Sequence, residues 1–162
     1  MKFSLDQGQR DFAASIDAAL GAADVPAAIR SWATGDAAPG RAVWSRLADL
    51  GVTALAVPEK FDGIDAHPVD LVVALERLGR WCVPGPVTES LAVAPVLLAD
   101  DDRVAALAAG EVIATVAMPP AVPRAVDADV ADVVLLATGA GVTDATAGAR
   151  HESVDPTRRL FD

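Results

Sequence analysis

The sequence has one cysteine and no tyrosine, and it has no uninterrupted apolar run long enough for a membrane span. The single Cys82 excludes an intramolecular disulfide and a zinc site built from cysteines. Asp, Gly or Pro breaks each apolar run well before the roughly 18 residues that a transmembrane helix needs. Residues 1–10 also lack the apolar segment of a secretory signal. The sequence therefore predicts a cytoplasmic protein that does not enter a membrane.

Basic residues are scarce: 13 Lys and Arg stand against 23 Asp and Glu, which gives a net charge of −10. Such a surface repels nucleic acid, so we expect no nucleic-acid partner. The length of 162 residues suits one domain, or one domain with part of another. Because 52% of the residues are hydrophobic, the chain has enough apolar side chains for a packed core.

Apolar residues at helical spacing predict an α-helical domain over residues 1–110. A capping box of Ser4 and Gln7 is expected to start the first helix. Gly21 and Pro26 are expected to end it. The other expected segments are a loop with one short helical turn over 22–39, a helix over 41–50, an extended stretch over 52–58, a helix over 68–80, a helix over 88–98 that Pro95 kinks, and a short helix from Asp101 or Asp102 to Gly110.

The helix expected over residues 68–80 has a clear apolar face, which consists of Leu71, Val72, Leu75 and Leu78. We expect Leu75 and Leu78 to be buried against the next helix, because a connection as short as residues 83–86 favours antiparallel neighbours.

The pattern changes at residue 111, where β-branched residues become frequent. Strands are expected over residues 112–117, 130–138 and 147–154. We therefore predict an α+β fold, mostly α, with a small β domain over 111–162. Three short strands make a thin sheet, so we expect an apolar surface that another domain or subunit covers.

The sequence contains no nucleophile motif, no phosphate-binding loop and no dinucleotide-binding glycine pattern, and we predict no catalytic residue and no metal site from it. His67 and His151 are expected at the surface, and Asp100–Asp102 at a solvated helix start. Cys82 is expected to fill the core rather than to react. The tryptophans expected in the core are Trp44 and Trp81.

Five segments, in order, resemble the N-terminal half of the acyl-CoA dehydrogenase family. They are MKFSLDQGQRDF (1–12), LGVTALAVP with Glu59 (50–59), LERLG with Arg80 (75–80), GEVIATVA (110–117) and SVDPTRRLF (153–161). The resemblance implies a helical domain, a middle β domain and a C-terminal four-helix domain. It also implies FAD, an acyl-CoA substrate that is oxidised to the 2,3-enoyl-CoA, and assembly as oligomers.

The chain departs from this family in two places. The catalytic glutamate of the family usually comes from the C-terminal helical domain, which is absent here, so we expect the chain to be catalytically incomplete. Met118–Ala128 stands where the family has a loop that holds flavin and substrate, so we expect no FAD on this chain alone. Shortened members of this kind resemble actinobacterial dehydrogenases built from two different subunits, often in lipid or steroid breakdown. A non-catalytic structural subunit is the alternative, and an unrelated small α-bundle domain is a third.

The resemblance places the acyl chain along the helix of residues 88–98. Val87 and Leu91 then correspond to acyl-pocket positions, while the flavin-binding residues stay unknown. Both side chains also fit an ordinary core, because apolar residues on a buried helix look the same in either role.

Overall fold

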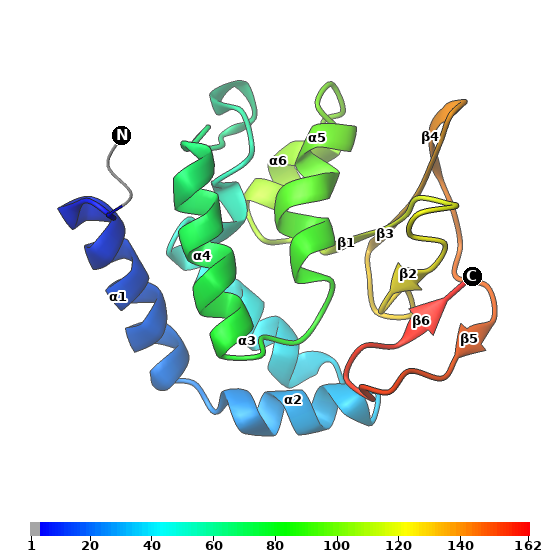
Figure 1. The fold of residues 1–162 in the computed structure, drawn as a ribbon, viewed down its shortest axis with the longest axis horizontal. Helices are drawn as coiled ribbons and strands as arrows, with labels where there is room; N and C mark the ends of the chain where they lie inside the picture. Colours follow the sequence, from blue (N-terminus) through cyan, green and yellow to red (C-terminus); the bar gives the residue numbers. More distant parts are fainter. Residues whose placement is uncertain (1–3) are drawn as a thin grey trace.

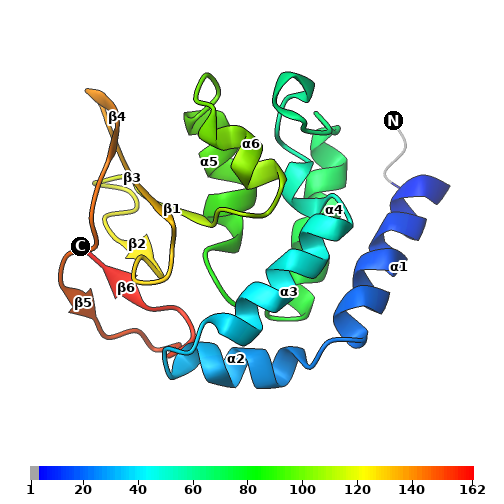
Figure 2. The same ribbon diagram turned by 180° about the vertical axis from the view of Figure 1, so that it is seen from behind.

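The computed structural model describes residues 4–162. Its first two thirds form a helical unit, seen from two sides in Figures 1 and 2. The helices are α1 (Gln7–Gly21), α2 (Val25–Ala33), α3 (Ala38–Asp49), the 3₁₀ turns η1 (Val52–Ala54) and η2 (Glu59–Phe61), α4 (Pro68–Arg80), the π-helical η3 (Glu89–Val93), α5 (Ala94–Leu97) and α6 (Arg103–Ala108).

The last third forms two small sheets. The strands are β1 (Ala114–Ala117), β2 (Ala125–Val126), β3 (Val133–Thr138), β4 (Gly141–Asp144), β5 (Arg150–His151) and β6 (Leu160–Phe161). One sheet has the order β1-β3-β4, with β1 parallel and β4 antiparallel to β3. The other has the order β2-β6-β5 and is antiparallel. In both views the β strands lie at the opposite end of the molecule from α1 (Figures 1 and 2). The α+β class, mostly α, is thereby confirmed.

The start of α1 differs from the expected one. Asp6 is the N-cap: its carboxylate accepts the Gln9 backbone N–H at 2.8 Å, and its own N–H donates to the Gln9 side chain at 3.1 Å. The capping box predicted from Ser4 and Gln7 is therefore wrong by two residues. The same pattern of residue types occurs at both places, and an aspartate is an equally good cap.

The helical turn predicted within the loop over residues 22–39 exists, but the segment is more helical than predicted, because it holds the whole of α2 and the start of α3. Pro26 lies in the first turn of α2 rather than ending α1, and Asp24 caps α2 by accepting the Ala27 N–H at 3.0 Å. Pro39 lies in the first turn of α3 in the same way. A proline fits a first helical turn because the N–H that it lacks has no partner there.

Two further segments depart from expectation in their local geometry. Residues 52–58 are not extended, since they begin with the buried η1 turn; Gly51 precedes it in the left-handed conformation, with φ of 75°. The helix expected over 88–98 contains the π turn η3, in which the Ala94 N–H donates to the Glu89 carbonyl. Pro95 explains this turn, because its ring lacks an N–H and crowds the preceding carbonyls.

The helix predicted over residues 68–80 is confirmed as α4, but its buried face is rotated from the predicted one. Leu78 is 1% exposed, whereas Val72 is 63% exposed and Leu75 is half-buried. The prediction that Val72 and Leu75 are buried was wrong. The residues of α4 that are fully buried are Val73, Ala74 and Leu78.

The strand expected over 147–154 shrinks to β5, and β2, β4 and β6 were not expected. Polar ties hold the β unit to the helices. Arg41 of α3 donates to Asp132 Oδ1 at 2.9 Å and Oδ2 at 3.0 Å, and Asp132 also accepts the Ile113 N–H at 2.9 Å. The buried Ser90 hydroxyl accepts the Ala114 N–H at 3.1 Å, which fixes β1 against η3.

No single helix within residues 4–162 is both long and apolar enough to cross a membrane. The α1–α2 pair reaches that length and composition only as two helices bent by 66°.

Candidate functional site

A cavity of about 270 Å³ lies between the C-terminal end of α4, the segment that leads into η3, and the stretch of chain before β6. Its apolar wall includes Leu75, Leu78, Val83 and Val87. Asp155, Thr157 and Arg158 form the opposite wall. We call this space the α4 cavity. Here the two halves of the chain enclose Val87, a residue that the resemblance assigns to an acyl pocket.

The two predicted acyl-pocket residues have different surroundings. Val87 is half-buried and lines the α4 cavity. Leu91 is 2% exposed and belongs to the core cluster that also contains Leu78. Leu91 therefore supports the cavity wall from behind, while the side chain of Val87 faces the open space.

Cys82 lies at the edge of the same cavity. Its backbone has a positive φ of 51°, which turns the chain out of α4. The side chain is exposed and lines the α4 cavity. The prediction that Cys82 fills the core was wrong, because this turn directs the residue away from the apolar face of α4.

The residues of the polar wall make contacts with one another and with Glu89. Asp155 Oδ1 accepts the Thr157 N–H at 2.8 Å and the Thr157 hydroxyl at 2.6 Å. These hydrogen bonds, together with the nearby Arg158 charge, lower the pKa of Asp155. Arg158 Nη2 lies 3.6 Å from Oε1 of Glu89, whose side chain is 15% exposed. The cavity therefore offers an apolar surface and one guanidinium that a carboxylate already faces.

Sequence reasoning missed Glu89, Asp155 and Arg158 as site residues. Asp155 and Arg158 belong to the SVDPTRRLF segment that carries the family resemblance, and Glu89 lies in the first turn of the predicted acyl helix. The signal was present in these segments, but the meeting of residues some seventy positions apart depends on the fold.

The segment Met118–Ala128 does not have the chemistry of a flavin-holding loop. Prolines occupy positions 119, 120 and 123, so three backbone N–H donors are missing. The Met118 N–H donates to the Val122 carbonyl at 2.6 Å, and the Val122 N–H donates to the Met118 carbonyl at 2.8 Å. Between them the side chains are apolar. Residues 118–123 therefore offer few donors to the oxygens and nitrogens of a flavin, and Arg124, the one guanidinium of the segment, already lies 3.4 Å from Asp162 Oδ1.

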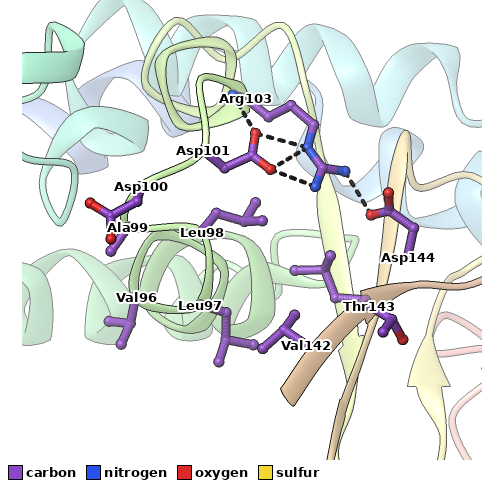
Figure 3. Close-up of a pocket in the computed structure, with 11 residues that line it drawn as sticks. Val96, Leu97, Leu98, Ala99, Asp100, Asp101, Arg103, Val142, Thr143 and Asp144 are labelled. Atoms are coloured by element: carbon purple, nitrogen blue, oxygen red, sulfur yellow. Dashed lines mark hydrogen bonds and ion pairs between the residues drawn. The ribbon is translucent and has the colours of Figure 1, made fainter. Parts of the chain in front are cut away.

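A second, larger cavity of about 620 Å³ lies between α5, α6 and β4 (Figure 3). Arg103 bridges its rim: Nη2 donates to Asp101 Oδ2 at 2.7 Å, and Nη1 donates to Asp144 Oδ1 at 2.7 Å. Hydrogen bonds from Arg103 lower the pKa of Asp101 to about 2. The Arg103 guanidinium is already paired with two carboxylates. We therefore assign Arg103 a structural role, in which it connects α6 to β4.

The remaining residues singled out from the sequence have structural positions. His67 caps α4 at the surface, where Nδ1 accepts the Val69 N–H at 3.3 Å. His151 lies in β5, 2.7 Å from Asp162. Trp44 is buried and donates to the Pro84 carbonyl at 2.8 Å, whereas Trp81 is half-buried. Among residues 4–162, no group of three or more His, Cys, Asp or Glu is placed to hold a metal ion.

A helical unit followed by small β sheets is the order of domains that the resemblance to the acyl-CoA dehydrogenase family implies for its N-terminal half. The profile of the acyl-CoA dehydrogenase N-terminal domain matches residues 6–100. The chain therefore belongs to the acyl-CoA dehydrogenase family.

Among curated proteins, acyl-CoA dehydrogenase IpdE2 of Mycobacterium tuberculosis is 31% identical over 142 residues, which cover 83% of this chain and 44% of that protein. Acyl-CoA dehydrogenase FadE34 of the same organism is 39% identical over 84 residues, which cover 52% of this chain and 12% of that protein. The chain thus spans less than half the length of these relatives.

Solved structures share the fold at lower identity. The ChsE4–ChsE5 complex from Mycobacterium tuberculosis superimposes with a TM-score of 0.73 at 20% identity, covering 100% of this chain and 55% of that one. A glutaryl-CoA dehydrogenase from Mycobacterium smegmatis in complex with FADH2 gives a TM-score of 0.72 at 15% identity, covering 97% of this chain and 52% of that one.

Proposed function

We propose that this chain provides the acyl-binding part of an acyl-CoA dehydrogenase that oxidises an acyl-CoA thioester to the 2,3-enoyl-CoA. The observation that carries the proposal is the position of Val87 in the α4 cavity, where an apolar wall meets the 155–158 segment. In this proposal residues 1–110 form the helical domain and residues 111–162 an abbreviated middle β domain.

The chemistry of the reaction needs two groups beyond the acyl pocket. A base must remove the α proton, and a flavin, when bound, accepts the β hydride. We assign both to polypeptide outside residues 1–162: the family's base belongs to the C-terminal helical domain, and Met118–Ala128 does not fit a flavin. The chain's own residues then bind and orient the acyl end of the substrate in the α4 cavity and exclude water from it.

A second candidate is a non-catalytic subunit that completes the site of a partner dehydrogenase. The closed turn between Met118 and Val122 favours it, because a subunit without flavin donors needs a partner that has them. The ChsE4–ChsE5 structure is a complex of two differently named subunits, which supports a hetero-oligomer for this chain as well. The substrate partner of such an assembly is again an acyl-CoA.

The purified chain is expected to carry no tightly bound FAD. The physical reason is the donor-poor Met118–Ala128 segment. Absorbance near 450 nm after mixing with excess FAD and gel filtration checks this, with the glutaryl-CoA dehydrogenase, after oxidation of its flavin in air, as a positive control. Flavin retained in stoichiometric amount would contradict the assignment of the cofactor to a partner.

Acyl binding is tested through Cys82. Because it is the only cysteine and lines the α4 cavity, its reaction with a thiol reagent reports on this cavity alone. Hexanoyl-CoA is expected to slow the reaction, and S-methyl-CoA, which has neither the acyl chain nor a free thiol that would consume the reagent, is expected to leave it unchanged. Equal rates with and without hexanoyl-CoA would overturn the acyl-binding role.

Val87→Phe fills the cavity and is expected to weaken protection by hexanoyl-CoA about tenfold or more, as for other changes of a few methylenes in an apolar pocket. Val96→Phe is the matched control, since Val96 is 71% exposed and does not line the cavity. Equal effects of the two substitutions would mean that protection arises elsewhere.

A further inference from the structure

The α4 cavity contains one cation among its lining residues, and that cation is already matched. Arg158, with a side chain 48% exposed, faces Glu89 across 3.6 Å. Asp155 lies on the same wall and is held in place by Thr157. Glu89 itself does not line the cavity. Arg158 thus has two carboxylates near it, Asp155 on the wall and Glu89 next to the wall, and the three charges together are negative.

Glu89 depends on Arg158. Its Oε2 is buried and has no hydrogen-bond partner within residues 4–162, while Oε1 faces Arg158. A ligand carboxylate that took Arg158 would leave Glu89 buried without its cation, which is strongly unfavourable. It would also place a second negative charge beside Glu89 and Asp155. Binding sites commonly discriminate between ligands in this way, because the disfavoured ligand leaves a charged group without a partner.

The size of the cavity limits what enters it. A volume of about 270 Å³ lies just below the roughly 300 Å³ at which pockets begin to enclose a whole small ligand. The cavity therefore takes the end of an acyl chain, and the chemical nature of that end decides the fit.

We propose that the α4 cavity selects acyl groups with an uncharged end over acyl groups that end in a carboxylate, and that Glu89 sets this selection by holding Arg158. This inference rests on the proposed function, because it concerns the same acyl-binding cavity. It goes further in naming the class of acyl group and the residue that discriminates.

Hexanoyl-CoA and adipoyl-CoA form a matched pair of probes, since both have six-carbon acyl chains and only the second ends in a carboxylate. Each is titrated against the rate at which a thiol reagent modifies Cys82. Adipoyl-CoA is expected to need at least about a tenfold higher concentration for half-protection. Equal protection, or better protection by adipoyl-CoA, would overturn the selection. Absence of protection by both would instead remove the proposed acyl-binding role itself.

Substitutions then test the role of Glu89. Glu89→Gln keeps the shape, removes the charge and frees Arg158, so protection by adipoyl-CoA should improve about tenfold relative to protection by hexanoyl-CoA. Adding Arg158→Gln should abolish that gain. Glu76→Gln is the matched control, because Glu76 also faces an arginine, but that arginine, Arg77, does not line the cavity as Arg158 does. An unchanged adipoyl-CoA response in Glu89→Gln, or an equal gain in Glu76→Gln, would overturn the role of Glu89.

Discussion

Replacing Arg159 with methionine is expected to lower the free energy of unfolding by about 3–5 kcal/mol, the usual loss when one partner of a buried ion pair is removed. Arg159 is 2% exposed and Asp127 is fully buried. The Arg159 backbone N–H donates to Asp127 Oδ1 at 3.1 Å, and Nη2 lies 3.4 Å from the same oxygen. Methionine keeps much of the volume but leaves the Asp127 carboxylate unpaired.

Arg159 also connects the two units of the fold. Its Nε donates to Asp129 Oδ1 at 3.1 Å, and Nη1 donates to the Trp32 carbonyl in α2. The guanidinium lies 5.6 Å from the centre of the Trp32 ring. Loss of Arg159 therefore weakens the attachment of β6 to the helical unit as well as the pairing of Asp127.

The loss should depend on pH in a defined direction. Burial raises the pKa of Asp127, and the hydrogen bond and charge of Arg159 oppose that rise. Without Arg159 the pKa rises further, so the folded variant binds a proton that the unfolded chain does not hold. The stability that this proton adds is present in full when the pH is below the pKa of Asp127 in the unfolded chain. It is lost as the pH increases through the higher pKa of Asp127 in the folded variant. The deficit relative to the unsubstituted protein should therefore shrink as pH falls from 7 toward 4.

Urea unfolding at several pH values measures this deficit. Asp127→Asn in the Arg159→Met background is expected to recover part of the stability at pH 7, because no buried charge then remains. Arg150→Met is the control, since this arginine of β5 is exposed and its replacement should cost at most about 1 kcal/mol. If Arg159→Met lost the same free energy of unfolding at all pH values, the proposed role of the Asp127 charge in that loss would be contradicted.

The sequence predicted those elements whose signal is local. The apolar period of residues 68–80 and the β-branched run before residue 118 each lie within one segment, and both elements exist. By contrast only a short helical turn was predicted where α2 lies, because Pro26 and Pro39 suggested breaks, although Pro26 stands in the first turn of α2 and Pro39 in the first turn of α3. The strands β2, β5 and β6 have two residues each, too few for any alternation to appear.

The candidate site was harder to predict, because its walls are far apart in the chain. Val87 was available from the family resemblance, but a cavity also needs the 155–158 segment to fold back onto α4. Arg159 is a similar case. A charged residue is expected at the surface, and only the partners Asp127 and Asp129, about thirty positions earlier, allow its burial.

The rotation of α4 gives a further test, in which Leu78→Ala should cost far more than a change at either of its apolar neighbours on the same helix. Leu78 is 1% exposed and packs in the core cluster with Leu91 and Ile16. Truncating a buried leucine removes apolar contacts and leaves a void, at a cost of about 2–5 kcal/mol. Leu75 is half-buried at the cavity edge, so Leu75→Ala should cost less than Leu78→Ala. Val72 is 63% exposed, and Val72→Ala should change stability by about 0.5 kcal/mol or less. Chemical denaturation of the three variants gives the order directly. A loss at Val72 equal to that at Leu78 would mean that the helix presents the face predicted from its sequence period, and that Val72 is covered in the folded protein.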